Sequence, residues 1–184
     1  MTSNLVPKAV FFTSGVGRNK EKLSSFELAL RNAGIHKYNL VNVSSIYPPK
    51  CKILSAEEGL KLLSPGQIVF TVMAQNSSNE PYRKISASVG CAIPKDENSY
   101  GYLSEHHGFG EDEKTASDYA EDLAAYMLAT TLGICDEDEI EWDSKKDIWK
   151  LDDKIVKTTN ITKVADVEKK KGWTTVVAAA VFIV

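Results

Sequence analysis

The stretch TASDYAEDLAAYMLATTL, residues 115–132, contains the clearest secondary-structure signal in the chain. Its apolar side chains recur at the spacing of one helix face, which predicts an amphipathic helix, and Gly133 follows as a typical stop signal. The apolar positions are Ala116, Tyr119, Ala120, Leu123, Ala124, Met127 and Leu128. A helix with one apolar face needs a surface to cover, and the rest of the sequence supplies strands for it.

Short apolar or alternating stretches on both sides of this helix predict strands. They are residues 9–13, 38–43, 67–74, 84–93, 100–103, 154–159 and 173–183. Two shorter helices are predicted, one around Leu23–Leu30 that ends near Gly34 and one over Ala56–Leu63. We expect a turn at Ser14–Gly17, a polar loop over Ser104–Lys114 and a surface insertion over Glu137–Asp153.

These elements predict an α/β fold of the layered α+β sandwich type, with helices covering β-sheets. The 184 residues suit one domain, residues 1–184, with a sizeable core. The net charge of −3 gives no electrostatic case for nucleic acid. The three cysteines, Cys51, Cys91 and Cys135, are too widely spaced to indicate a disulfide framework or a zinc site.

We expect a cytoplasmic protein that does not enter the membrane. The first residues lack the basic and apolar regions of a signal peptide. The apolar C-terminal stretch, Val176–Val184, is far shorter than the roughly 20 residues that span a bilayer.

The segment NLVNVSSIYPP, residues 39–49, is the strongest candidate for chemistry. An alternating strand pattern runs into Ser44-Ser45, and Pro48-Pro49 then prevents a regular ladder from continuing. A pair of serines alone is typical of an ordinary loop.

With its surroundings, however, this segment resembles the pyruvoyl-dependent arginine decarboxylases. Three blocks match in the family's order, and together they extend the resemblance over about residues 9–132. They are FELAL…AGI…NLV from Phe26 to Val41, VSSI…PP from Val43 to Pro49, and GYLSEHH from Gly101 to His107, which continues through YAEDLA at 119–124. ISASVG at 85–90 also fits the family.

The resemblance implies self-cleavage between Ser44 and Ser45. The Ser45 hydroxyl attacks the Ser44 carbonyl, and elimination and hydrolysis then convert residue 45 into a covalent pyruvoyl group. The products would be a short chain, 1–44, and a long chain, 45–184. The pyruvoyl carbonyl would form a Schiff base with L-arginine and accept electrons as CO₂ leaves, giving agmatine without pyridoxal phosphate or metal. The resemblance further implies a homotrimer with active sites between subunits.

Two polar residues match family positions that serve these steps. Asn39 could donate an amide hydrogen bond to the oxyanion of the cleavage step, or it could simply begin a strand. Glu105 falls at the catalytic acid of the family, which would return a proton to the substrate α-carbon. The alternative for Glu105 is a solvated carboxylate in a polar loop.

Two residues of the early helix match the substrate-binding positions of the family. At the position of Glu27 we expect an aspartate that binds the substrate guanidinium. The extra methylene of glutamate changes the reach of the carboxylate, so the sequence does not decide which amino acid is the substrate. Leu30, one turn later, could contact the substrate's methylene stem or belong to the core. His106 and His107 are adjacent, so their side chains should point apart, and we do not expect a metal site there.

Two other functions remain open. A pyruvoyl-dependent decarboxylase could act on another amino acid, with Glu27 setting the preference. Alternatively, an uncleaved homologue could keep the fold as a non-catalytic binding subunit. The joint presence of Asn39, Ser44, Ser45 and Glu105 argues against the second alternative.

Overall fold

The computed structural model of the chain describes residues 5–134, 155–169 and 172–184. The predicted insertion, Glu137–Asp153, and Cys135 lie outside the described residues. Nine strands and three helices are described, and their bounds follow in chain order: β1 Ala9–Asn19, α1 Lys22–Asn32, β2 Asn39–Asn42, β3 Ile46–Tyr47, β4 Lys52–Leu54, α2 Ala56–Lys61, β5 Ile68–Ser78, β6 Lys84–Pro94, β7 Gly101–Phe109, α3 Glu113–Thr131, β8 Ile155–Asp166 and β9 Trp173–Ile183.

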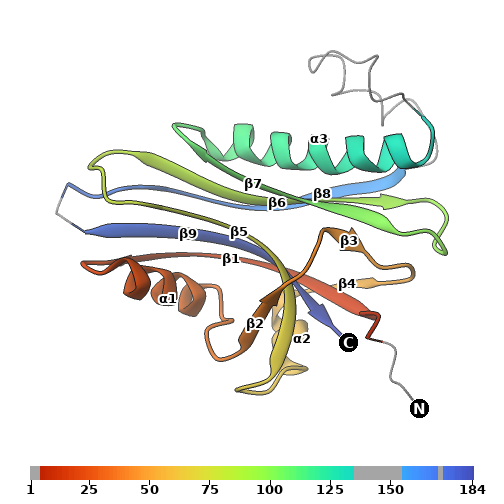
Figure 1. The fold of residues 1–184 in the computed structure, drawn as a ribbon, viewed down its shortest axis with the longest axis horizontal. Coiled ribbons are helices and arrows are strands. Elements are labelled where there is room, and N and C mark those ends of the chain that lie inside the picture. Colours follow the sequence, from red (N-terminus) through yellow and green to blue (C-terminus); the bar gives the residue numbers. More distant parts are fainter. Residues whose placement is uncertain (1–4, 135–154, 170–171) are drawn as a thin grey trace.

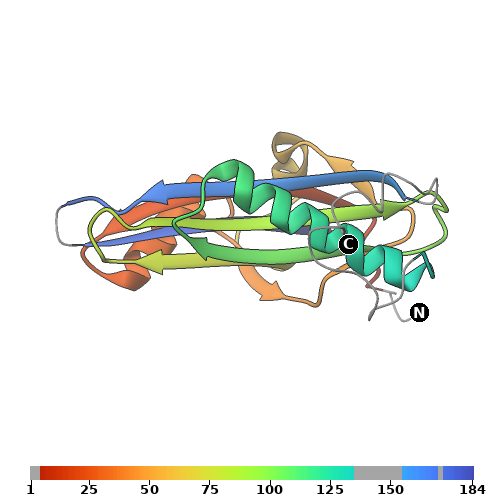
Figure 2. The same cartoon turned by 90° about the horizontal axis from the view of Figure 1, so that it is seen from above.

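The strands form two stacked sheets, and helices cover the outer face of each. One sheet has the order β2-β5-β9-β1-β4, and the other has the order β3-β7-β6-β8. Figure 1 shows α1 and α2 on one side of the stack and α3 on the other, and Figure 2 shows α3 crossing its sheet obliquely. The result is a sandwich of helices, sheet, sheet and helix, which confirms the predicted α+β layering.

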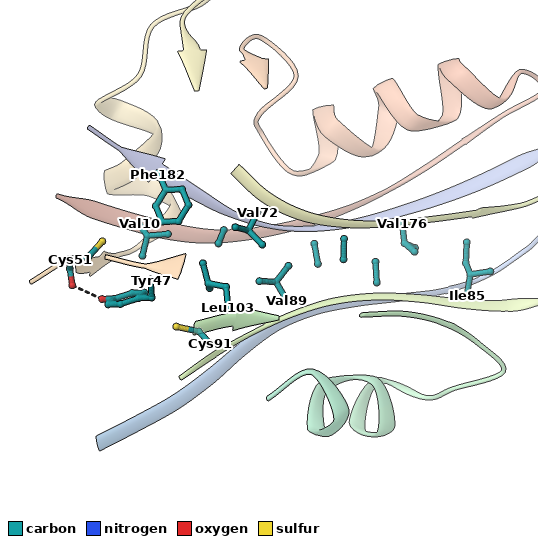
Figure 3. Packing of buried hydrophobic residues seen from close by; sticks show 14 residues of the cluster. Val10, Tyr47, Cys51, Val72, Ile85, Val89, Cys91, Leu103, Val176 and Phe182 are labelled. Atoms are coloured by element: carbon teal, nitrogen blue, oxygen red, sulfur yellow. Dashed lines mark hydrogen bonds between the residues drawn. The ribbon is translucent and has the colours of Figure 1, made fainter. Parts of the chain in front are cut away.

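Apolar packing between the sheets forms the main core (Figure 3). Strand β9 pairs antiparallel with both β1 and β5, so it lies at the centre of its sheet. Alternate residues of β9 face opposite directions. Val176, Ala178, Ala180 and Phe182 join the inter-sheet core, while Val177, Ala179 and Val181 join the cluster beneath α1 and α2. Burial on both faces explains the uninterrupted apolar run at the C-terminus.

The expected turn at Ser14–Gly17 is wrong, because β1 continues through it to Asn19. The two glycines make this possible by removing side chains from the face that α1 covers. A Cβ at Gly15 would collide with the carbonyl oxygen of Ala29, and one at Gly17 with that of Ser25. The helix therefore packs directly on the strand backbone.

The expected loop over Ser104–Lys114 is also wrong over its first half, because β7 extends to Phe109. Strand β7 pairs with β6 through the whole polar segment, from Ala92↔Tyr102 to Ile85↔Phe109. Polar side chains persist here because one face of this edge region is open to solvent. None of the helices in the described part of the chain has the length and apolar character needed to cross a membrane.

One end of the inter-sheet core contains three ionisable groups in a neutral state. Tyr47, Cys51 and Cys91 are buried, and the Tyr47 hydroxyl donates a hydrogen bond to the Cys51 carbonyl. Burial raises the pKa of Cys51 to about 11 and that of Cys91 to about 12, and it also raises the pKa of Tyr47. Burial disfavours the charged form of each group.

These shifts predict a loss of stability in alkali. In the unfolded chain a thiol ionises near pH 8.5. The stabilisation from keeping it neutral is therefore complete below that pH and is lost as pH rises toward the folded-state values. We expect the free energy of unfolding, measured in urea, to fall between pH 8 and pH 11, and to fall less steeply in Cys91→Ala. Equal slopes in the two proteins would contradict this origin.

Candidate active site

The Ser44-Ser45 pair lies where the chain passes from one sheet to the other. Strand β2, which ends at Asn42, belongs to the five-stranded sheet, and β3, which begins at Ile46, is an edge strand of the four-stranded sheet. Figure 1 shows the chain between β2 and β3 crossing this gap. Ser44 is exposed and Ser45 is half-buried.

Hydrogen bonds hold the crossing on both sides. On the first side, the Val43 amide donates to the Thr71 carbonyl of β5 at 2.9 Å. On the second, the Leu103 amide of β7 donates to the Ser45 carbonyl at 2.8 Å. The bond between Ser44 and Ser45 therefore lies between two fixed points on different sheets.

Glu105 is brought to the same place by β7. It follows Leu103 by two residues, so both side chains lie on the same face and their Cα atoms are about 7 Å apart. Its Oε1 accepts a hydrogen bond from the Met73 amide of β5 at 3.2 Å. That amide is available because β2 has already left the edge of β5, where Asn42 is the last residue paired, with Thr71.

His106 points the other way. Its Nε2 lies 2.8 Å from Glu111 Oε2, and its ring contacts that of Tyr119 on α3 with centroids 4.4 Å apart. Glu105 contacts β5 instead, so the side chains of Glu105 and His106 lie on opposite faces of β7. Within the described residues, no cluster of three His, Cys, Asp or Glu side chains could hold a metal.

A hollow of about 440 Å³ lies between α1 and β2. Its lining includes two of the predicted site residues, Leu30 and Asn39, and also Met73, whose amide binds Glu105. The full lining is Phe26, Leu30, Tyr38, Asn39, Leu40, Asn42 and Met73. The Asn39 side chain donates from Nδ2 to the Gly66 carbonyl at 2.7 Å, at the start of β2.

Three residues of this region escaped the sequence analysis. Met73 acts through a main-chain amide, which leaves no signal in side-chain type. Asn42 accepts a hydrogen bond from the Thr71 hydroxyl, and the alternation of β2 was its only hint. Tyr38 is buried in the lining, and its hydroxyl has no hydrogen-bond partner among the described residues.

Glu27 stands apart from the other predicted residues. Its carboxylate pairs with Arg31, one turn along α1, at 2.5 Å, and 43% of its side chain is exposed. It does not line the hollow to which Leu30 contributes. Within one chain, Ser45 is thus bonded to β7 two residues from Glu105, and Leu30 lines a hollow together with Asn39.

Comparison with known proteins identifies the family of the chain. The family model described as pyruvoyl-dependent arginine decarboxylase matches residues 9–184, and the chain belongs to this family. The match extends beyond the resemblance over residues 9–132 and includes residues 133–184.

Similar proteins cover almost the whole chain. A probable pyruvoyl-dependent arginine decarboxylase of Chlorobium phaeovibrioides is 59% identical over 98% of this chain and 99% of its own length. Pyruvoyl-dependent arginine decarboxylases of Thermoplasma volcanium and Methanococcoides burtonii are 56% and 53% identical, over 99% and 97% of this chain and 99% of each relative.

Proposed function

We propose that this protein decarboxylates L-arginine to agmatine and CO₂, using a pyruvoyl group that it makes from its own Ser45. The observation that carries the proposal is the position of Ser44-Ser45 at the crossing between the sheets, two β7 residues from Glu105. Membership of the family supports the same activity.

The residues at the crossing suit this group. Residue 45 supplies the serine from which it forms, and the Leu103 amide already binds the carbonyl of that residue. When present, the group supplies a carbonyl that binds the substrate amine and accepts the electrons released as CO₂ departs. Self-cleavage would divide the single domain into chains 1–44 and 45–184.

The chain's own side chains would then bind the substrate and move its proton. Glu105 is the proposed acid that returns a proton to the α-carbon, because it is the carboxylate that β7 brings beside residue 45. Leu30, together with Phe26 and Leu40 in the same hollow, offers an apolar surface to a methylene stem. Asn39 borders the same hollow, and its predicted role as an oxyanion donor stays a proposal.

We further propose a homotrimer, in which a second copy covers the face beside the crossing. An apolar hollow of about 630 Å³ lies there, with Val43 and Ile46 from either side of the serines in its lining. Ile46 and Tyr100 in this lining are 39% and 42% exposed, respectively. Exposed apolar surface of this kind is typical of interfaces. We place the protein in the cytoplasm, which suits the free thiols of Cys51 and Cys91.

Maturation gives the first prediction for the activity. Purified protein should separate without added protease into chains 1–44 and 45–184, seen as two bands on a denaturing gel and two intact masses. Ser45→Ala should remain one chain without arginine turnover, because it lacks the attacking hydroxyl. A single uncleaved chain in the wild type would favour the non-catalytic alternative, and an active Ser45→Ala protein would refute the proposal.

Glu105 should serve turnover and not maturation. Glu105→Gln keeps the size of the side chain and removes its exchangeable proton, so cleavage should proceed while kcat falls by at least about 10²-fold. Glu80→Gln is a matched control, because Glu80 is an exposed glutamate that pairs with Arg83 on the surface. Loss of cleavage in Glu105→Gln would reassign the residue to maturation. Unchanged turnover would make it a solvated carboxylate.

Glu27 should determine the preference for arginine. A planar guanidinium pairs with a carboxylate through two hydrogen bonds, and lysine cannot reproduce that geometry. Glu27→Gln should therefore cleave normally but raise KM for arginine by about 10–100-fold. Glu57→Gln is the matched control, because Glu57 makes an equivalent surface pair with Lys61. Equal turnover of lysine by the wild type would favour the alternative substrate.

The exposure of Glu27 also makes the trimer testable. If Glu27 acts on a site in a neighbouring copy, co-expression of Ser45→Ala with Glu27→Gln should restore sites that have both an intact residue 45 and an intact Glu27. Those mixed trimers should show the wild-type KM for arginine. If only the raised KM is observed, Glu27 does not act across a subunit boundary.

A further inference from the structure

The carbonyl that self-cleavage would attack already accepts a main-chain hydrogen bond. The Ile46 amide donates to the Ser44 carbonyl oxygen at 2.9 Å. A bond from residue i+2 back to residue i closes a three-residue γ-turn, here with Ser45 at its centre. The nucleophile, the attacked carbonyl and a donor to that carbonyl therefore belong to one turn.

The hand of the turn fixes the backbone of the nucleophile. Among the described non-glycine residues, positive φ occurs only at Lys50 and Tyr82. The turn at Ser45 is therefore the inverse type, with φ near about −75° and ψ near about +65°. With the backbone fixed, rotation about χ1 is the one remaining freedom that brings the Ser45 hydroxyl toward the Ser44 carbonyl carbon.

The Ile46 amide is also not used in the hydrogen bonding between β3 and β7. Strand β3 is an edge strand, and its pairing with β7 places Ile46 opposite Tyr102. The hydrogen bond that anchors this crossing to β7 runs from the Leu103 amide to Ser45, and it does not involve the Ile46 amide. The Ile46 N–H is thus committed to the Ser44 carbonyl.

We propose that the main-chain N–H of Ile46 is an oxyanion donor in the self-cleavage of this chain. The inference rests on the proposed function and adds a donor to it. The Ser45 Oγ forms a bond to the Ser44 carbonyl carbon as its proton departs, and the C=O π electrons move to oxygen, where the Ile46 N–H binds the negative charge. The oxyanion then re-forms the C=O bond as the C–N bond breaks, and the electron pair of the C–N bond stays on the Ser45 nitrogen. That nitrogen takes up a proton, which leaves an ester and a free amine.

A donor that binds charge appearing during a reaction favours the transition state over the ground state. Hydrogen bonds to an ionised oxygen are roughly twice as strong as neutral ones. The side-chain amide of Asn39, the other candidate oxyanion donor, donates instead to the Gly66 carbonyl at 2.7 Å. In this structure, the hydrogen bond recorded on the Ser44 carbonyl comes from the backbone of Ile46.

A backbone ester tests the proposal directly. Residues 1–50 can be synthesised and joined to 51–184 at Cys51, and an ester in place of the Ser45–Ile46 amide replaces the Ile46 N–H with oxygen. The matched control carries the ester at Lys50, whose amide donates to the Glu97 carbonyl at 3.0 Å, away from the serines.

Refolding starts the reaction, circular dichroism and thermal unfolding report folding, and intact mass identifies the bond that breaks. Hydroxylamine releases fragment 1–44 from the ester intermediate and so isolates the first step.

We expect the ester at Ile46 to slow hydroxylamine-dependent cleavage by about 10²-fold, while the ester at Lys50 leaves it near the rate of the unmodified chain. A folded Ile46 ester that cleaves at the unmodified rate would overturn the assignment. If the unmodified chain itself did not cleave between Ser44 and Ser45, the proposed function would fail first, so the two failures are distinguishable.

A genetically encoded pair provides the second measurement. Ile46→Pro removes the same N–H at an edge strand, where proline is tolerated, while Ile46→Val keeps it. We expect slow cleavage in Ile46→Pro and nearly normal cleavage in Ile46→Val. If Ile46→Pro folds and cleaves like Ile46→Val, the donor role is wrong. If neither the ester at Ile46 nor Ile46→Pro folds, the N–H is structural and the assignment is also wrong.

Discussion

The apolar layer between the two sheets is the interaction on which the site depends. Packed sheets lie about 10 Å apart. The chain passes from one sheet to the other between Val43, bonded to Thr71, and Ile46, paired with Tyr102 on the second sheet. The apolar core keeps these two attachment points on different sheets, and Ser44-Ser45 lie in the short segment that connects them.

The same spacing brings the open edges of β5 and β7 together. Strand β2 leaves β5 after Asn42, which exposes the Met73 amide, and Glu105 projects from β7 to bind it. Further along the same two strands, the side-chain amide of Asn76 donates to the Gly108 carbonyl at 2.8 Å. These contacts between β5 and β7 fix where Glu105 lies relative to the Ser44-Ser45 crossing. A carboxylate on a loop would lack that constraint, because only the strand ties its position to that of Leu103.

Local patterns sufficed to predict the helices and the central strands of this fold. The stripe on α3 and the run in β9 are long and strongly periodic, and the structure confirms both. The errors occurred where tertiary contacts override local preference. Gly15 and Gly17 suggest a turn in the sequence, but in the structure α1 packs on them. At Gly90 the absence of a side chain similarly lets Ala120 of α3 pack against the backbone of β6. The polar half of β7 suggests a loop because its hydrogen-bond partner, β6, is not visible in a local window.

The candidate site was predictable to a different extent. The serine pair and Glu105 were identified through the ordered blocks of a family, and the structure explains their proximity by the register of Ser45 against Leu103. The main-chain donors of Met73 and Ile46 could not be identified in this way, since every residue except proline has an N–H. Their significance depends on which strand edge is left open and on where the chain turns. The exposed position of Glu27 is also a tertiary fact, since the α1 pattern alone placed it beside Leu30.

The placement of the crossing has a final consequence for the cleaved protein. A break between Ser44 and Ser45 would leave each new end held by a different sheet, one through Val43 and Thr71 and the other through Ser45 and Leu103. The short chain would also keep β1, which pairs with β9 along its whole length from Ala9↔Ile183 to Asn19↔Trp173. Neither set of hydrogen bonds passes through the broken bond. The fold can therefore lose its covalent continuity at a place where the two sheets hold the chain from opposite sides, and residue 45 would remain beside Glu105 after the break.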